Sequence, residues 1–294
     1  FYTVLNDAKR PWRLYRHRLG TAASDDVLVH QEDDESFYVG IGRSRSDEWL
    51  VLWMNSMVTS EARVLRADDP AGEFRVVEPR RHGVEYGLEH QGDRFLIVTN
   101  DDAENFRLVE APVSDPGRAN WKDVLPHRAD VKVDDVDAFA SHVAVYERAD
   151  AVRQIRIIDA VTGDAHTIEQ PEAVSTASAG TNLEYDTDIL RFGYTSLVTP
   201  ASVFDYDVRA RTRALKKQQH VLCGYEPSQY DLRSFISPKQ EAGEEFFQLD
   251  YLNLVTNLGT YGLNREQHAE MNSGKYSRAE SDHLFNVYMN RHAM

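Results

Sequence analysis

The chain has 294 residues, and a hydrophobic content of 41% with 14 tyrosines and 12 phenylalanines favours a folded core over a disordered segment. Its formal net charge of −15 argues against binding to nucleic acid or to an anionic membrane surface, because both need a basic face. A single cysteine, Cys223, excludes an intrachain disulfide, and without a signal peptide or membrane-spanning apolar run the sequence predicts a cytoplasmic protein.

Five short β-rich runs, each with a charged turn at its end, recur at intervals of 44 to 49 residues. They end at Arg18, Ala67, Ala111, Asp159 and Asp207. A repeat of this length that consists only of strands is typical of a β-propeller, in which each repeat is one four-stranded blade. The sequence therefore predicts an all-β fold.

The strands of each repeat follow from apolar runs and the turns between them. The first predicted blade is partial, with strands at residues 1–5, 12–19 and 27–31. Because the chain opens directly on a strand and without methionine, we expect its first residue to be a cut or a boundary. Four complete blades follow, with strands at residues 37–44, 49–55, 60–67 and 74–78; 84–90, 94–100, 105–111 and 121–127; 131–140, 142–148, 154–159 and 166–169; and 175–180, 189–197, 202–208 and 213–218. Together they predict one propeller domain over residues 1–232.

The position of a strand within its blade can also be predicted. Phe95 and Ile97 alternate with Leu96 and Val98, so both faces of this strand are apolar, which is typical of a strand enclosed between neighbouring blades. Residues 213–217 are more polar than the inner strands and contain two lysines, which predicts an outermost strand whose exposed edge the lysines protect.

The pattern changes after residue 232. Apolar residues follow helical spacing from Phe247 to Leu258, and residues 277–280 match a capping box before a second apolar stretch. The sequence therefore predicts a linker and a short α-helical tail of two or three helices over residues 233–294. Cys223 lies before this region, and we interpret it as a small hydrophobic residue at a strand end.

Motifs for chemistry are missing from the sequence. Gly40 and Gly42 begin like a dinucleotide fingerprint, but no third glycine and no helix follow, so we interpret them as positions crowded by backbone near a central channel. The sequence contains no Gly-x-Ser-x-Gly nucleophile elbow, no His-Glu-x-x-His, no EF-hand and no P-loop pattern. It thus predicts no catalytic, cofactor-binding or metal-binding residue, and no cofactor.

The histidines are scattered along the chain. His17, His90, His127, His142 and His166 fall on or beside strands of different blades, and no two stand at the spacing of metal ligands. We expect these five to be structural residues with satisfied hydrogen bonds.

Two acidic runs allow two interpretations. Asp33-Asp34-Glu35 and Asp134-Asp135 lie at predicted loops and strand starts, where a solvated loop is the simplest interpretation. The alternative is a carboxylate pair at the channel mouth that attracts basic peptides.

Several long runs resemble the propeller domain of oligopeptidase B, a serine peptidase of the prolyl oligopeptidase family. They are YRHRLGT (15–21), RRHGVEY (80–86), EHQGDRFLIVTN (89–100), NFRL (105–108), LRFGYTSLVTP (190–200), KQQ (217–219), GYEP (224–227) and Tyr230. The resemblance covers residues 1–232. It implies a seven-bladed propeller that covers an α/β-hydrolase domain and screens substrates by size, while the hydrolase domain cleaves short peptides after Arg or Lys.

The catalytic Ser, Asp and His of that family have no matching positions in this sequence. The resemblance therefore implies a substrate-gating segment, inactive by itself, with a hydrolase domain and short basic peptides as its partners. The alternative is a stand-alone interaction module that binds a protein partner or its own copy through the rim and the helical tail. An incomplete ring favours such self-association, because it exposes blade faces and a free strand edge.

Overall fold

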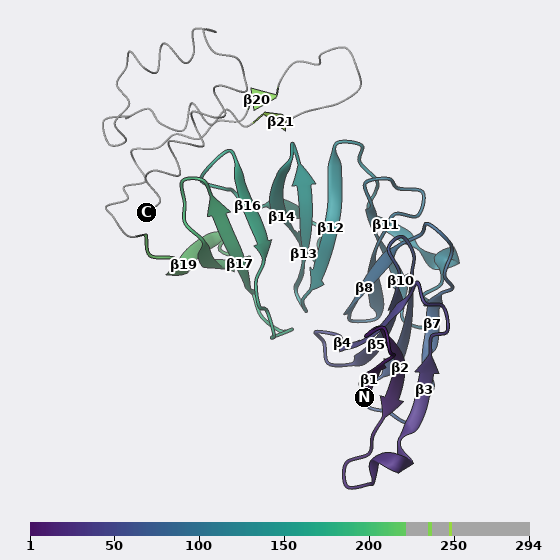
Figure 1. Ribbon diagram of the computed structural model, residues 1–294. Coiled ribbons are helices and arrows are strands. Elements are labelled where there is room, and N and C mark those ends of the chain that lie inside the picture. Colours follow the sequence, from purple (N-terminus) through teal and green to yellow (C-terminus); the bar gives the residue numbers. More distant parts are fainter. Residues whose placement is uncertain (222–234, 237–246, 249–294) are drawn as a thin grey trace, which may run out of the picture. The chain divides into compact units, whose positions relative to one another are not determined.

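The computed structural model describes residues 1–221, 235–236 and 247–248. The chain divides into two units, Phe1–His220 and Val221–Met294. Figure 1 shows the strands of the first unit in sheets that follow one another in chain order. Cys223 and the boundary predicted at residue 232 lie outside the described residues.

The first unit consists of five blades. The strands of the first blade are β1 (Tyr2–Leu5), β2 (Pro11–Arg16) and β3 (Val27–Gln31). Those of the second are β4 (Tyr38–Arg43), β5 (Trp49–Asn55), β6 (Ser60–Arg66) and β7 (Arg75–Glu78). Those of the third are β8 (Tyr86–Gln91), β9 (Arg94–Thr99), β10 (Arg107–Pro112) and β11 (Lys122–Leu125). Those of the fourth are β12 (Val131–Ala138), β13 (His142–Ala149), β14 (Val152–Asp159) and β15 (Ala165–Thr167). Those of the fifth are β16 (Ser175–Ala179), β17 (Ile189–Ser196), β18 (Ser202–Asp207) and β19 (Thr212–Gln218).

The predicted blades are confirmed, one with three strands and four with four. Within each blade consecutive strands pair antiparallel, so short turns can join them. One parallel pair, between Arg153 and Thr176, joins the fourth and fifth blades into a single eight-stranded sheet. Two short 3₁₀ helices, η1 (Ala23–Asp25) and η2 (Arg118–Asn120), lie in connections before the outer strands β3 and β11.

Apolar seams hold neighbouring blades together. The second and third blades share a cluster that contains Val51 and Phe95, and the third and fourth share another that contains Leu96 and Val143. Strand β9 contributes to both, because its alternate residues point to opposite faces. Each large side chain buried in this way contributes about 1.5–3 kcal/mol to stability. The prediction of a strand with two apolar faces is therefore confirmed.

The outermost strand of the fifth blade is also as predicted, since every residue of β19 is exposed. The explanation offered for the glycines of β4 is wrong. A methyl group added at Gly42 would meet no atom within 4 Å, and one at Gly40 would meet only Trp53 Cβ, at 4.0 Å. Neighbouring backbone therefore does not require glycine at either position. The sequence pattern alone could not reveal how much space surrounds Gly40 and Gly42.

The described part of the second unit contains two short strands, β20 (Phe235–Ile236) and β21 (Phe247–Gln248), which pair antiparallel. The sequence places Phe247 on a helix, and this prediction is wrong at that residue. Short apolar runs have the spacing of either element, and here pairing between two segments decided it. The rest of the predicted helical tail lies outside the described residues, and the described residues contain no helix with the length and hydrophobicity needed to cross a membrane.

Candidate functional site

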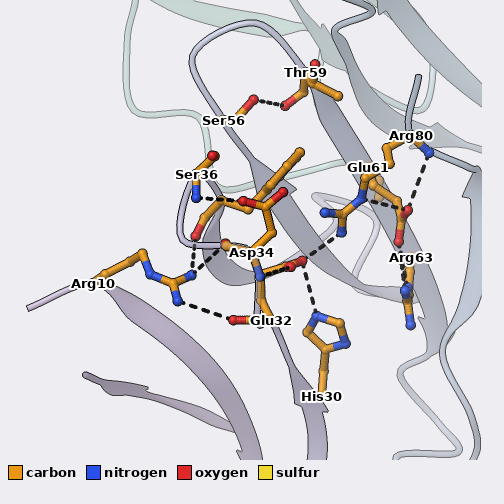
Figure 2. A network of polar contacts seen from close by, with 12 residues as sticks. Arg10, His30, Glu32, Asp34, Ser36, Ser56, Thr59, Glu61, Arg63 and Arg80 are labelled. Atoms are coloured by element: carbon orange, nitrogen blue, oxygen red, sulfur yellow. Dashed lines mark hydrogen bonds and ion pairs between the residues drawn. The ribbon is translucent and has the colours of Figure 1, made fainter. Parts of the chain in front are cut away.

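Two groups of acidic residues in the first unit are at least partly shielded from water, and the first is neutralised by arginine. Figure 2 shows Arg80, from the connection between β7 and β8, lying between two carboxylates of other strands and connections. Its guanidinium contacts Glu32 at 2.7 Å and Glu61 at 3.3 Å, and Arg63 contacts Glu61 at 2.8 Å. Burial opposes ionisation of Glu61, but Arg63 and Arg80 outweigh it and lower the pKa of this carboxyl group.

The acidic run Asp33-Asp34-Glu35 belongs to this network (Figure 2). Arg10 donates hydrogen bonds to the carbonyl oxygens of Asp34 at 3.1 Å and Phe37 at 2.6 Å. The carboxylate of Asp34 accepts the backbone N–H of Ser36 at 2.9 Å, and this bond lowers its pKa. The run is thus an ordered connection between the first two blades rather than a free carboxylate pair.

Buried carboxylates paired with arginines also occur in the third and fourth blades. Asp101, 3% exposed, pairs with Arg81 at 2.8 Å and with Arg118. Glu147, whose side chain is fully buried, pairs with Arg128 and, at 3.0 Å, with Arg156. Removing one partner of such a buried pair leaves a charge without compensation, so these groups contribute to architecture rather than to chemistry.

The second group of acids lies on the innermost strands. In a propeller the first strand of each blade faces the central axis. Glu89 on β8 and Asp135 and Asp137 on β12 lie in this position. Asp137 pairs with Arg45, which lies in the turn between β4 and β5, and accepts a hydrogen bond from the Tyr146 hydroxyl at 2.6 Å. One arginine therefore serves a cluster of three carboxylates.

Burial and repulsion between carboxylates raise the pKa values of groups in this cluster. Burial, with the charges of Asp137 and Asp135, raises the pKa of Glu89 to about 7, although Arg45 acts in the opposite direction. Partial loss of water around Asp135, together with the neighbouring carboxylates, raises its pKa as well. Burial and the charge of Asp137 also raise the pKa of the Tyr146 hydroxyl. A cation that approached these side chains would relieve unfavourable interactions.

A cavity of about 300 Å³ opens beside the cluster. Its walls include Glu85 at the start of the third blade, and Asp134 and Asp135, which sit at an irregularity in the pairing of β12 with β13. The acidic pair predicted from the sequence is therefore placed on a cavity wall. Asp134 pairs with Arg148 at 3.0 Å, whereas the nearest polar contact of the Asp135 carboxylate is the adjacent backbone N–H of Val136.

The five histidines are not brought together, except that His142 and His166 line one cavity of about 220 Å³ in the fourth and fifth blades. Each has a polar contact, His142 with Ser141 and His166 with Tyr206. The expectation of satisfied hydrogen bonds is wrong for His90 and His142, because their buried Nε2 atoms lack a partner within residues 1–221. His17 contacts Asp26, His90 contacts Ser46, and His127 is exposed. No group of three possible ligands for a metal ion occurs among residues 1–221.

Ser141 lies between a carboxylate and an imidazole, an arrangement that sequence reasoning missed. Its hydroxyl is 2.8 Å from Asp188 Oδ1 and 3.1 Å from His142 Nδ1. In a nucleophilic triad the histidine stands between serine and carboxylate, so that the imidazole accepts the serine proton. Here the serine stands between the other two, and burial lowers the pKa of His142 to about 4. These contacts fix a turn and do not activate a nucleophile.

Sequence reasoning also missed Glu89, Asp137 and Arg45. Glu89 follows the buried Leu88 and precedes the buried His90, and Asp137 stands between the buried residues Val136 and Ala138. The apolar neighbours of Asp137 are a signal that could have found it, whereas the burial around Glu89 is visible only in the structure. Arg45 lies in a turn of ordinary composition, and nothing in the sequence predicts its partner on β12.

Comparisons with known proteins agree with this architecture. The family described as prolyl oligopeptidase, N-terminal beta-propeller domain, matches residues 1–219. Dipeptidyl aminopeptidase BI from Pseudoxanthomonas mexicana is 40% identical over 230 residues, which are 78% of this chain and 31% of the relative. Protease 2 from Moraxella lacunata is 28% identical over 78% of this chain and 33% of its own length.

Among solved structures, oligopeptidase B from Trypanosoma brucei with covalently bound antipain superposes with a TM-score of 0.73 and 29% identity. The match covers 80% of this chain and 35% of that protein. The chain thus spans about a third of the length of these relatives. The resemblance to the oligopeptidase B propeller is confirmed, and the chain belongs to the prolyl oligopeptidase family, with residues 1–219 as its N-terminal β-propeller domain.

Proposed function

We propose that this chain is the substrate-gating propeller of an oligopeptidase B-like serine peptidase in the cytoplasm. By itself it is not catalytic, and a hydrolase domain supplies cleavage of short peptides after Arg or Lys. The family membership supports the pairing with a hydrolase domain. The acidic inner strands support the preference for basic peptides.

The observation that carries the proposal is the poorly compensated cluster of Glu89, Asp135 and Asp137 beside an acidic cavity. Carboxylates gathered in a concave site of low polarizability concentrate cations and steer them inward. An arginine-containing peptide would enter this field favourably. The arginine-paired acids at the seams take no part, because their charge is already neutralised.

Binding to the 294-residue chain tests this step. We would titrate the blocked tripeptide Gly-Arg-Gly, and its neutral analogue with citrulline, at low and physiological salt by calorimetry. We expect tighter binding of the arginine peptide, weakened by salt and by Asp135→Asn, with Glu104→Gln, an exposed acid, as the matched control. Equal binding of both peptides without salt dependence would contradict the proposal.

The hydrolase step needs a separate test. A fluorophosphonate probe should leave the 294-residue chain unlabelled and should label the polypeptide made from the natural gene. Labelling of the 294-residue chain would contradict the non-catalytic role.

The alternative is a stand-alone interaction module that binds a partner or its own copy through the rim. Large apolar side chains exposed at loop tips support it, among them Leu19 and Val161, each 91% exposed. A natural gene that ends at Met294, with a dimer mass in light scattering, would favour this alternative.

A further inference from the structure

One connection in the fifth blade reaches three other blades. Residues 180–188 join β16 to β17, and Tyr185 accepts the backbone N–H of Ala140 at 2.9 Å through its carbonyl and that of Gly92 at 3.2 Å through its hydroxyl. The Arg45 guanidinium donates to the carbonyl oxygen of Asn182. These three partners lie in the turns between the first and second strands of the second, third and fourth blades.

These contacts place residues 180–188 across the turns between the first and second strands of the blades, on the side of the central axis. Neighbouring blades meet through apolar seams, which run from the first blade to the fifth in order. Arg45, in the second blade, contacts Asp137 in the fourth and Asn182 in the fifth, so its contacts bypass the third blade. Contacts between blades that are not neighbours have to cross the inner side. Figure 1 shows the connection between β16 and β17 approaching the turn between β4 and β5.

The contacts of Arg45 form a compact latch. Its side chain is 14% exposed and that of Asp137 is 16% exposed, so the ion pair is largely shielded from water. The guanidinium carbon lies 4.8 Å from the centre of the Phe139 ring, and Tyr146 fixes the other oxygen of Asp137. Charge-assisted hydrogen bonds of this kind are roughly twice as strong as neutral ones.

The latch also has unused hydrogen-bonding capacity. Within residues 1–221, Arg45 Nε and Glu89 Oε2 are both buried and lack a hydrogen-bond partner. Glu89 belongs to the same carboxylate cluster, with Asp135 and Asp137. Arg45 therefore has a second carboxylate in its surroundings besides that of Asp137.

The base of the connection is fixed, and its tip carries one exposed apolar side chain. Asn182 accepts the backbone N–H of Arg191 at 2.8 Å and donates to the carbonyl oxygen of Arg191 at 2.9 Å. A side chain at Gly180 would approach the same carbonyl oxygen to 2.5 Å. The tip residue Leu183 is 84% exposed. A segment with few apolar contacts and an anchored base can open without disturbing the blades.

We propose that residues 180–188 form a lid over one end of the propeller, the end that holds the turns between the first and second strands of the blades. Arg45 latches this lid through its contacts with Asp137 and Asn182. The lid closes this end whether or not basic peptides are the cargo, so it goes beyond the proposed function. It leaves the cavity beside Asp135 as a separate feature.

Amide hydrogen exchange of the full 294-residue chain tests the lid. The reporters are the amides of Ala140 and Gly92, which bond to Tyr185, and that of Arg191, which bonds to the base. In Arg45→Gln we expect Ala140 and Gly92 to exchange about tenfold faster or more, with Arg191 unchanged. The matched control is Arg43→Gln, because the Arg43 side chain is 55% exposed and, within residues 1–221, its polar contacts are with Asp47.

Two further variants keep the test decisive. Asp137→Asn removes the latch from its other end and should accelerate the same two amides, even if Arg45→Gln does not fold. Tyr185→Phe removes one acceptor and should accelerate Gly92 alone. Exchange in both latch variants that equals the Arg43→Gln control, or acceleration of all three amides together, would overturn the lid. Peptide binding is not measured here, so failure of the lid and failure of the proposed function are distinguishable.

Discussion

The raised pKa of Glu89 predicts how the free energy of unfolding depends on pH. It lies on β8 with one carboxylate oxygen buried and without a hydrogen-bond partner among residues 1–221. Burial and the charges of Asp137 and Asp135 raise its pKa from an ordinary value of 4.5 to about 7. Ionisation is therefore harder in the folded protein than in the unfolded chain, and Glu89→Gln should stabilise the fold at neutral pH.

The sign and size follow from proton linkage. Below pH 4.5 both states hold the proton, and Glu89 contributes no difference in stability. Between pH 4.5 and 7 the unfolded chain ionises first, so stability is lost as pH rises, and above pH 7 the loss is complete. The full difference corresponds to about 3 kcal/mol. Because part of the side chain remains accessible to water, we expect Glu89→Gln to gain about 1–2 kcal/mol at pH 8.

Urea unfolding followed by tryptophan fluorescence is the assay. Trp12, Trp49, Trp53 and Trp121 are the 4 tryptophans of the chain, and all lie in the propeller unit, so the signal reports on that unit. The unfolding free energies of Glu89→Gln and the parent should converge below pH 4.5 and separate at pH 8. Glu104→Gln, at an exposed position, should match the parent at both values. A gain that is equal at both pH values, or absent at pH 8, would refute the reasoning.

Three further outcomes follow from burial. Phe192→Ala, at a fully buried position of β17, should cost about 3–5 kcal/mol in urea unfolding, against a small effect for the half-exposed Leu197→Ala; equal costs would contradict the assigned seam. Glu147→Ala should cost about 3–5 kcal/mol because it leaves two arginines unpaired, whereas Asp134→Asn at a more exposed pair should cost less than about 1 kcal/mol. His142 has its pKa lowered to about 4 by burial, so the parent should lose stability as pH falls from 6.5 toward 4; His142→Gln should remove this loss, and an unchanged pH profile would argue against the assignment.

Much of the fold could be predicted from local pattern, while much of the candidate site could not. The two apolar faces of residues 95–98 identified an enclosed strand, because alternation depends only on neighbours along the chain. The acidic pair Asp134-Asp135 was identified, but its place on a cavity wall depends on the packing of several blades. The helical spacing from Phe247 was misleading at its first residue, since a strand pairing with Ile236 decided that element.

The sequence by itself determined the strands, their grouping into blades and the family to which they belong. These properties depend on residues a few positions apart, or on a repeat that the chain carries from end to end. Only the tertiary structure decided which carboxylates are neutralised and which are left to repel one another. Arg45 meets Asp137 across 92 positions, and Arg80 meets Glu32 across 48. Such pairings are set by the stacking of the blades, because apolar burial fixes their positions and charged side chains then contact whatever lies within reach.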